Sequence, residues 1–404
     1  MSYLFEKTQV EAADSPSLDA FGRWRSSNPV TLFDGRVNHG EAAQWSNVLV
    51  SGTLAYTHNH DQAMVTLTST ANTAGRRLRQ SLKRFNYTPG KSQLILMTFV
   101  MGAGVGGNKK KVGQFDDYNG IFFQQDGSEA SFNIRTYTSG SAVDTKTVQA
   151  DWNLDTFDGT GPSGITLDLS KTQILVIDYE WLGVGRVRIG FNIDGVTYYC
   201  HQILNANNNT LVYMTTANLP LRYEMEHSGT GGASEMGCIC CTVISEGGSE
   251  ILGVPGGRAT GLQTGLTAGT AYAMILMRLQ AAHGKHGPII QIVGVDVLGT
   301  TNNDSFEWLI VRDPDLLTGT PTYDAIPNSA MELEIGGSGF TVNMTNADII
   351  SMGIGISQSD IVIPFADQIQ LESTADDVAI PFAVVIKPYS SMTAAAAVRW
   401  RQYG

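Results

Sequence analysis

Short runs of strand-forming residues, each closed by a turn-forming cluster, recur along most of this chain and constrain its fold more than any other feature. Gly-rich or Asp-Gly clusters separate the runs, and Asp194-Gly195 between two of them is a strong hairpin signal. Amphipathic helical periodicity is almost absent. The pattern therefore predicts an all-β fold of antiparallel β-sandwich or jelly-roll domains rather than a crossover α/β fold. The runs before residue 204 are 48–56, 63–69, 93–101, 120–125, 131–137, 173–181, 187–193 and 197–203.

The length of 404 residues exceeds that of one ordinary domain of about 100 to 200 residues, so two folded units in tandem are expected. A Gly-rich stretch at residues 243–262 marks the best boundary between them. We therefore predict an extended N-terminal arm at 1–35, a β-sandwich at 36–249, and a second β-sandwich or jelly-roll domain at 250–404. The run Phe-Phe-Gln-Gln-Asp-Gly at 122–127 and the later Phe-Asn-Ile-Asp-Gly-Val at 191–196 resemble a concanavalin-type sandwich in layout, which implies a concanavalin-like arrangement for the domain at 36–249.

Period-two alternation also predicts side-chain directions. The segment 392–404 fits either a short helix or a closing strand, and in a strand Val398 and Trp400 face one way. In the Cys-Ile-Cys-Cys run at 238–241, the first two cysteines share a face and the third points to the other. They therefore do not converge on a tetrahedral ion, and with Cys200 they are expected to be buried free thiols without a metal.

Residues 19–34 combine arginines with large apolar side chains. Gly22 and Pro29 discourage a continuous helix there, and Pro29 biases Asn28 toward extended geometry. Such a segment can hardly bury its own apolar groups, so they need a surface, on which the planar arginine forks would find carboxylates or carbonyl oxygens. That surface is either another protein or the chain's own core, in which case the segment is an N-terminal strand. The residues predicted to dock to a partner are Phe21, Arg23, Trp24, Arg25, Leu32 and Phe33.

The same stretch, Phe-Gly-Arg-Trp-Arg-Ser-Ser-Asn-Pro-Val-Thr-Leu-Phe-Asp at 21–34, resembles the opening of a widespread group of tailed-bacteriophage virion structural proteins. The resemblance implies a structural component, assembled in the host cytoplasm and then present in the virion, with other virion proteins as partners. It does not distinguish the head, neck, tail or baseplate. Similar blocks occur at 89–98, 115–123, 153–155, 158–165, 176–188 and 308–313.

The net charge of −12 argues against a chain that wraps nucleic acid, because backbone binding is driven by basic residues. Basic residues gather at 76–79, with Lys83-Arg84, and at 109–111. A solvated face or a turn explains these runs, and DNA contact is the alternative. We expect neither a signal peptide nor a membrane span, because no apolar run approaches about 20 residues.

The sharpest enzymatic candidate is Ile-Asp-Tyr-Glu-Trp at 177–181, because alternation projects Asp178 and Glu180 from one face of a strand. Glycosidases of the concanavalin-type sandwich carry a pattern similar to Glu-x-Asp-x-x-Glu. Here Val176 and Trp181 occupy the positions of the outer carboxylates, so a polar, solvent-facing strand explains the acids better than hydrolysis. Asp178, Tyr179, Glu180 and Trp181 remain a possible glycan-binding set.

Adjacent carboxylates at Asp116 and Asp117, followed by Asn119, could ligate a hard cation such as calcium. A turn stabilised by Asx hydrogen bonds needs the same residue types. The turn is favoured, because no downstream glutamate at a loop spacing supports the ion.

The leading hypothesis is a non-enzymatic virion structural protein that docks through its arm and forms a homo-oligomer, a trimer or higher, which would cover the sheet edges of a β-rich chain. It would be a head, neck or tail accessory, fibre or adaptor protein. The alternative is a carbohydrate-binding receptor-recognition module of a phage fibre, with a host surface glycan as ligand. A polysaccharide depolymerase is the third hypothesis. No cofactor or catalytic residue is expected.

Overall fold

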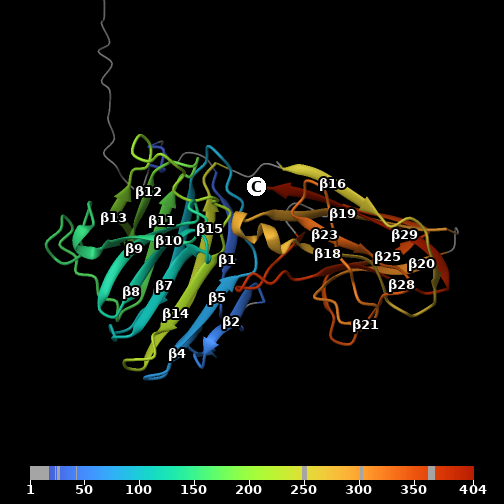
Figure 1. The fold of residues 1–404 in the computed structure, drawn as a ribbon, viewed down its shortest axis with the longest axis horizontal. Coiled ribbons are helices and arrows are strands. Elements are labelled where there is room, and N and C mark those ends of the chain that lie inside the picture. The colour runs from blue at the N-terminus through green and yellow to red at the C-terminus, as the bar shows by residue number, and fades with distance from the viewer. Residues whose placement is uncertain are drawn as a thin grey trace, which may run out of the picture.

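The computed structural model describes residues 18–22, 24, 28–41, 43–247, 253–300, 304–362 and 369–404. Antiparallel strands dominate these residues, and their only helical elements are the 3-10 turns η1 (Gln149–Asp151) and η2 (Ala281–His286). The predicted all-β antiparallel fold is therefore confirmed. Figure 1 shows two β units side by side, the first in blue to yellow-green and the second in yellow to red.

The first unit is a sandwich of two sheets. One sheet has the strand order β13-β12-β11-β6-β15-β4-β3, with β1 also paired to β15, and the other has the order β10-β9-β8-β7-β14-β5-β2. The strands are β1 (Val30–Gly35), β2 (Trp45–Gly52), β3 (Ala55–Asn59), β4 (Met64–Ser69), β5 (Gly75–Ser81), β6 (Gln93–Val100), β7 (Asn108–Phe115), β8 (Gly120–Asp126), β9 (Glu129–Thr136), β10 (Val143–Val148), β11 (Gln173–Tyr179), β12 (Val187–Ile193), β13 (Val196–Ile203), β14 (Leu221–His227) and β15 (Ser234–Ser245).

Strict alternation builds the core between these sheets. In β6 every second side chain, including Ile95, Met97 and Phe99, is buried. Aromatic rings fill the centre, where Phe132 stacks on Trp152 with ring centroids 4.2 Å apart. The hairpin signal at Asp194-Gly195 is confirmed, because both residues have positive φ values, 51° and 82°, and join β12 to β13.

The second unit is a 14-stranded arrangement in which β18, β20 and β28 are buried on both faces. In β28, for example, Val384 belongs to one hydrophobic core and Val385 to the other. Its strands are β16 (Val254–Ala259), β17 (Gln263–Leu266), β18 (Tyr272–Leu279), β19 (Ile289–Gly299), β20 (Ser305–Arg312), β21 (Leu316–Thr318), β22 (Asp324–Ala325), β23 (Met331–Ile335), β24 (Thr341–Val342), β25 (Asp348–Ile356), β26 (Gln358–Val362), β27 (Ile369–Gln370), β28 (Phe382–Pro388) and β29 (Met392–Tyr403).

The segment at 392–404 forms a strand, β29, and not a helix. Ala394, Ala396, Val398 and Trp400 are buried along one face of it, so the predicted common direction of Val398 and Trp400 is confirmed. The strand pairs with β19 and β16, which places it inside the sheet.

The predicted arm ends earlier than residue 35, because β1 belongs to the first sandwich. Phe33 is part of the core and Leu32 packs against it, so these two residues are not free to dock elsewhere. The cause lies in the length of β15. Its first half pairs with β4 from Ser234 to Cys238, and on the same side β1 pairs with Cys241 to Ser245. The second half of β15 thus pairs with the N-terminal segment, which becomes the strand β1.

The cysteine directions expected from strict alternation are wrong. A register shift in the pairing of β15 with β6 lies between Cys238 and Cys241, and such a bulge reverses alternation. As a result Cys238 and Cys241 both lie in the core, whereas Cys240 is exposed. Burial raises the pKa of the Cys238 thiol to about 12.

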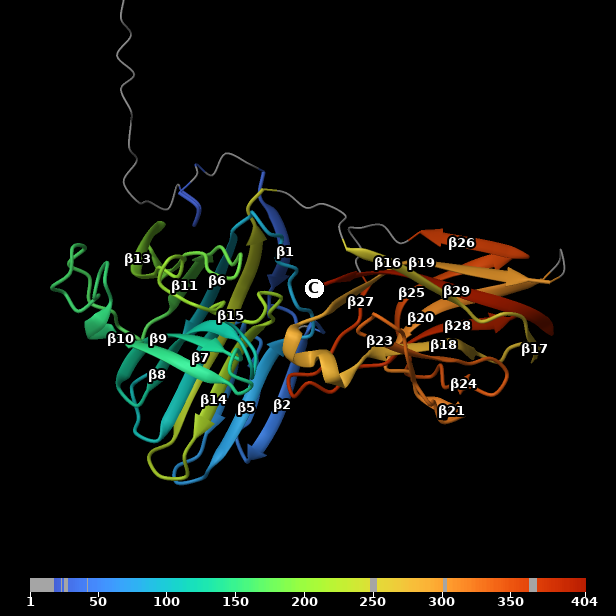
Figure 2. The ribbon, with the colours of Figure 1, turned by 45° about the horizontal axis from the view of Figure 1, so that its top comes forward.

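A loop of the second unit closes the junction between the units. Figure 2 shows η2 at this junction, and the loop between Ser373 and Ala379, closed by a β-bridge, lies there as well. The Ala375 N–H donates to Ser46 Oγ at 3.1 Å, and its carbonyl accepts from Arg222 at 3.2 Å. These bonds join β2 and β14 to the second unit.

Candidate functional site

The predicted docking segment is held on the first sandwich by two arginines. The Arg186 side chain donates to the carbonyls of Ala20 and Asp19, and Arg188 Nη2 donates to the carbonyl of Leu18 at 2.6 Å. Leu18, Asp19 and Ala20 are all buried as a result. Residues 18–20 therefore cover the outer face of the sheet beside β12.

We call the hydrogen bonds from Arg186 and Arg188 to residues 18–20 the clamp. After the clamp the chain turns, and the Trp24 side chain is exposed to solvent. The turn is closed by the Gly22 N–H bonding to the Asp19 carbonyl at 2.9 Å, and Gly22 has a φ of 77°. Phe21 is half-buried, whereas Trp24 is 63% exposed. Of the predicted docking residues, Trp24 is thus the one that presents a large apolar surface to solvent. Arg23 and Arg25 lie outside the described residues.

The expectation that Asp178 lies on a solvent-facing strand is wrong. Its carboxylate is fully buried and pairs with Arg188 at 2.5 Å. The Tyr199 hydroxyl donates to the same carboxylate oxygen at 2.8 Å, and the Arg188 guanidinium lies over the Tyr199 ring. β11 is an inner strand, and residues 18–20 cover its neighbour, so Asp178 orients Arg188 instead of facing a ligand.

None of the other three residues of the predicted glycan-binding set has an exposed side chain, and Tyr179 and Trp181 both contact the Tyr87 ring. Tyr179 is fully buried in the core, and burial raises the pKa of its hydroxyl well above the usual value. Glu180 lies past the end of β11 and accepts the Arg186 N–H at 3.2 Å. Trp181 is half-buried and donates to the carbonyl of Met214 at 3.1 Å. The four side chains therefore do not form one exposed surface.

Asp116 and Asp117 serve a turn and ion pairs. Asp116 accepts the N–H groups of Tyr118 and Asn119, both at 2.8 Å, which is the predicted Asx geometry, and it pairs with Arg84 at 2.6 Å. Asp117 pairs with Arg222 at 2.5 Å. Arginine donors thus occupy the oxygens that a cation would need. No group of three or more His, Cys, Asp or Glu residues suited to a metal ion occurs in the described part of the chain.

Several residues of the basic runs are paired with carboxylates on the outer face of the second sheet. Glu224 on β14 is fully buried and accepts from Lys111 at 2.8 Å and from Arg76 at 2.9 Å. Burial alone would raise the pKa of Glu224, but Lys111, Arg76 and Arg222 outweigh it and hold the pKa far below the usual range. These cations are therefore engaged within the protein.

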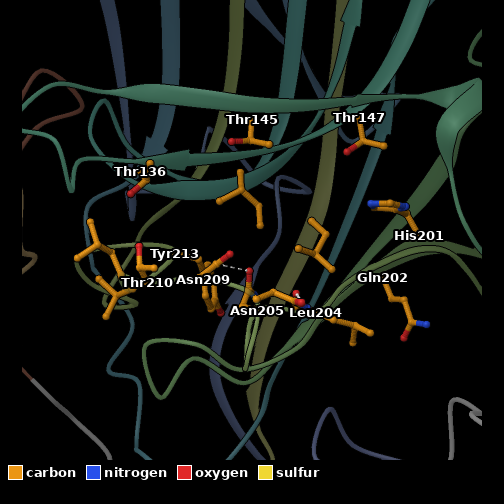
Figure 3. Close-up of a pocket in the computed structure, with 15 residues that line it drawn as sticks. Thr136, Thr145, Thr147, His201, Gln202, Leu204, Asn205, Asn209, Thr210 and Tyr213 are labelled. Atoms are coloured by element: carbon orange, nitrogen blue, oxygen red, sulfur yellow. Dashed lines mark hydrogen bonds between the residues drawn. The ribbon is translucent and has the colours of Figure 1, made fainter.

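A cavity of about 620 Å³ opens between the β9–β10 hairpin and the loop that follows β13 (Figure 3). Thr136, Thr145 and Thr147 project from the hairpin on one side, and the loop at 204–213 forms the other side. Local bonds shape this loop, because Asn209 donates to Asn205 Oδ1 at 3.0 Å. The lining residues are Ile134, Thr136, Thr145, Thr147, His201, Gln202, Ile203, Leu204, Asn205, Asn208, Asn209, Thr210, Leu211, Val212 and Tyr213.

This cavity carries neutral polar groups and no formal charge. His201 Nδ1 accepts the Asn153 N–H at 3.2 Å, which leaves the proton of the neutral ring on Nε2. Burial lowers the pKa of His201 and so favours that neutral form. The sequence pattern gave no sign of the site, because its threonines and its loop are separated by more than fifty residues and become neighbours only when the sandwich forms.

A row of exposed apolar side chains marks β25 in the second unit. Met352, Ile354 and Ile356 alternate along the strand and are 56%, 70% and 66% exposed. β25 pairs with β20 along its length and meets β26 only at Ile356 and Gln358. Within the described residues its other edge is therefore open, and the row lies beside that edge.

No family model and no curated protein matches this chain. Among solved structures, a protein of unknown function from Shewanella oneidensis MR-1 is 10% identical with a TM-score of 0.36, over 60% of this chain and 99% of that one. A GH16 protein of Bacteroides ovatus is 12% identical with a TM-score of 0.36, over 52% and 99%. The CBM2 module of an evolved Dit from Lactobacillus casei BL23 phage J-1 is 9% identical with a TM-score of 0.34, over 55% and 98%.

Proposed function

We propose that this chain is a structural component of a tailed-phage particle, which docks to a neighbouring virion protein through the segment around Trp24. The exposed indole of Trp24 carries the proposal, because tryptophan is the residue type most enriched at the energetic centre of protein interfaces. The resemblance of residues 21–34 to virion structural proteins supplies the class of partner.

The clamp on residues 18–20 supports this role. An arm that is fully flexible loses conformational freedom when it binds, and this loss weakens binding. Arg186 and Arg188 hold the chain just before Trp24, so part of that entropy has already been lost in the free protein. The segment is thus partly pre-organised for a partner.

The proposal includes a homo-oligomer, and the apolar row on β25 is the surface it would cover. Natural proteins rarely leave a long apolar edge strand open, because such an edge pairs with other chains. Covering β25 by another copy removes both the open edge and the exposed Met352, Ile354 and Ile356 side chains.

Incorporation into particles tests the docking role. Trp24→Ala is compared with Leu262→Ala, which truncates a side chain of similar exposure, 61%, on the second unit. We expect Trp24→Ala to fold normally and to lose most of its incorporation, since truncating an aromatic anchor typically costs roughly 2 kcal/mol or more. Leu262→Ala is expected to assemble normally. Normal stoichiometry of the Trp24 variant in particles would refute the proposal.

A further inference from the structure

We propose that the cavity between the β9–β10 hairpin and the loop at 204–213 binds an uncharged oligosaccharide. Its volume of about 620 Å³ lies within the range of small-ligand sites. This inference is independent of the docking role, because the cavity uses none of the residues of the N-terminal segment.

The chemistry of the lining selects a ligand rich in hydroxyl groups. Threonine hydroxyls and the amides of Asn and Gln each offer both a donor and an acceptor, and a sugar hydroxyl needs both. In the described part of the chain the side-chain hydroxyls of Thr145 and Thr147 make no hydrogen bond to protein, so they are available to a ligand. His201 adds a donor at Nε2, since its Nδ1 is already occupied by the Asn153 N–H.

The lining also has the apolar component that a sugar ring requires. Leu204 and Leu211 are exposed at the cavity, and Val212 lies beside Leu211. A pyranose presents one face of C–H groups and an edge of hydroxyls, so an apolar rim beside threonine and amide groups matches both parts of the ring.

The absence of charge among the fifteen lining residues argues against an anionic glycan. A uronate or sialate carboxylate placed there would lose hydration without gaining an arginine or lysine partner, which is unfavourable. The cavity should therefore discriminate between neutral and acidic sugars of the same size.

The experiment measures binding of defined trisaccharides by saturation-transfer NMR and titration calorimetry. The neutral probes are trisaccharides of glucose, galactose and mannose, and the charged probe is trigalacturonate. The peptide acetyl-Ser-Ser-Ser-amide presents hydroxyls without sugar rings. We expect at least one neutral trisaccharide to bind, and we expect trigalacturonate and the peptide to bind at least tenfold more weakly.

The matched variants replace threonine by valine, which keeps the branched shape and removes the hydroxyl. Thr145→Val with Thr147→Val is expected to weaken binding of the neutral trisaccharide about tenfold, the loss of one to two neutral hydrogen bonds. Thr66→Val with Thr68→Val on β4 is the control and should leave binding unchanged. The proposal is wrong if no neutral trisaccharide binds at millimolar concentration, if the charged or peptide probe binds as well, or if the cavity variant binds like the control.

Discussion

Asp178 and Arg188 form a fully buried ion pair directly across β11 and β12, and the same guanidinium nitrogen of Arg188 reaches the carbonyl of Leu18. Asp178, which the sequence analysis names as a candidate for carbohydrate chemistry, thus orients the arginine that binds the N-terminal segment. Asp178 holds Arg188, and Arg188 holds the chain. Carboxylate, guanidinium and carbonyl follow one another from the sheet outward.

Asp178→Asn should therefore destabilise the protein substantially, although the sequence alone predicts a small effect. Removing one partner of a buried ion pair leaves the other charge uncompensated and typically costs about 3 to 5 kcal/mol. Thermal unfolding measures the loss. Asp34→Asn is the control, because Asp34 pairs with Arg36 at an exposed position and should cost under about 1 kcal/mol. Equal melting temperatures of the two variants would contradict the clamp.

Two truncations should behave differently. A chain that lacks residues 1–24 loses the clamped segment but keeps β1, so it is expected to remain folded. A chain that lacks residues 1–35 also loses Phe33 from the core and exposes the second half of β15, so it should unfold at lower temperature and aggregate. Size-exclusion chromatography and circular dichroism compare them. If both truncated chains are equally stable, β1 does not contribute to the sandwich as described.

Protonation of Glu224 should lower the free energy of unfolding in acid. The pKa of Glu224 is lowered in the folded protein from a usual value of 4.5, so the unfolded chain binds protons first as the pH falls. Its contribution is complete above about pH 4.5 and is lost progressively below it. Glu224→Gln should be strongly destabilised at pH 7, and its difference from the unmodified protein should shrink below pH 4.5. A difference that stays constant down to pH 3, measured by urea unfolding, would contradict the assignment.

Changing the exposed row on β25 should affect association and not folding. Ile354→Lys is expected to lower the measured mass of an oligomer, because it places a charge where apolar contact is proposed, while the melting temperature of the fold stays close to that of the unmodified protein. Val254→Lys, at the same 70% exposure on β16, is the control. Light scattering after size-exclusion chromatography gives the masses. An unchanged mass for Ile354→Lys would exclude β25 from the interface.

Local pattern predicted the strands but could not predict which strands become neighbours. The hairpin at Asp194-Gly195 follows from its two residues, and the direction of Trp400 follows from alternation. The pairing of β1 with β15 joins segments about two hundred residues apart. Nothing in the sequence of either segment indicates that β15 is long enough to pair with both β4 and β1 on one side. The bulge between Cys238 and Cys241 is likewise fixed by the pairing with β6.

The candidate sites show the same limit. Trp24 is among the six residues that the sequence predicts to dock, but nothing in the sequence separates it from Phe33, which lies in the core. The burial of Asp178 could not be found from the sequence, since its cover comes from residues 18–20, and Leu18 lies 170 positions from Arg188. A cross-strand pair could have been suspected from Asp178 and Arg188, which are ten residues apart around a turn. The neutral cavity has no motif, because it is made of common residues brought together by the fold.

The loop around Ala375 has a consequence for how the protein is made. Ser46 and Ala375 are 329 positions apart, and a ribosome adding about 5 to 20 residues per second needs on the order of half a minute to pass from one to the other. During that time the first sandwich can fold, but Arg222 must hydrogen-bond to water where it will later meet the Ala375 carbonyl. The loop around Ala375 belongs to the last tenth of the chain to be synthesised, and it then covers Ser46 and Arg222 on the first sandwich. A ribosome that stops early therefore releases a sandwich on which these two residues stay uncovered.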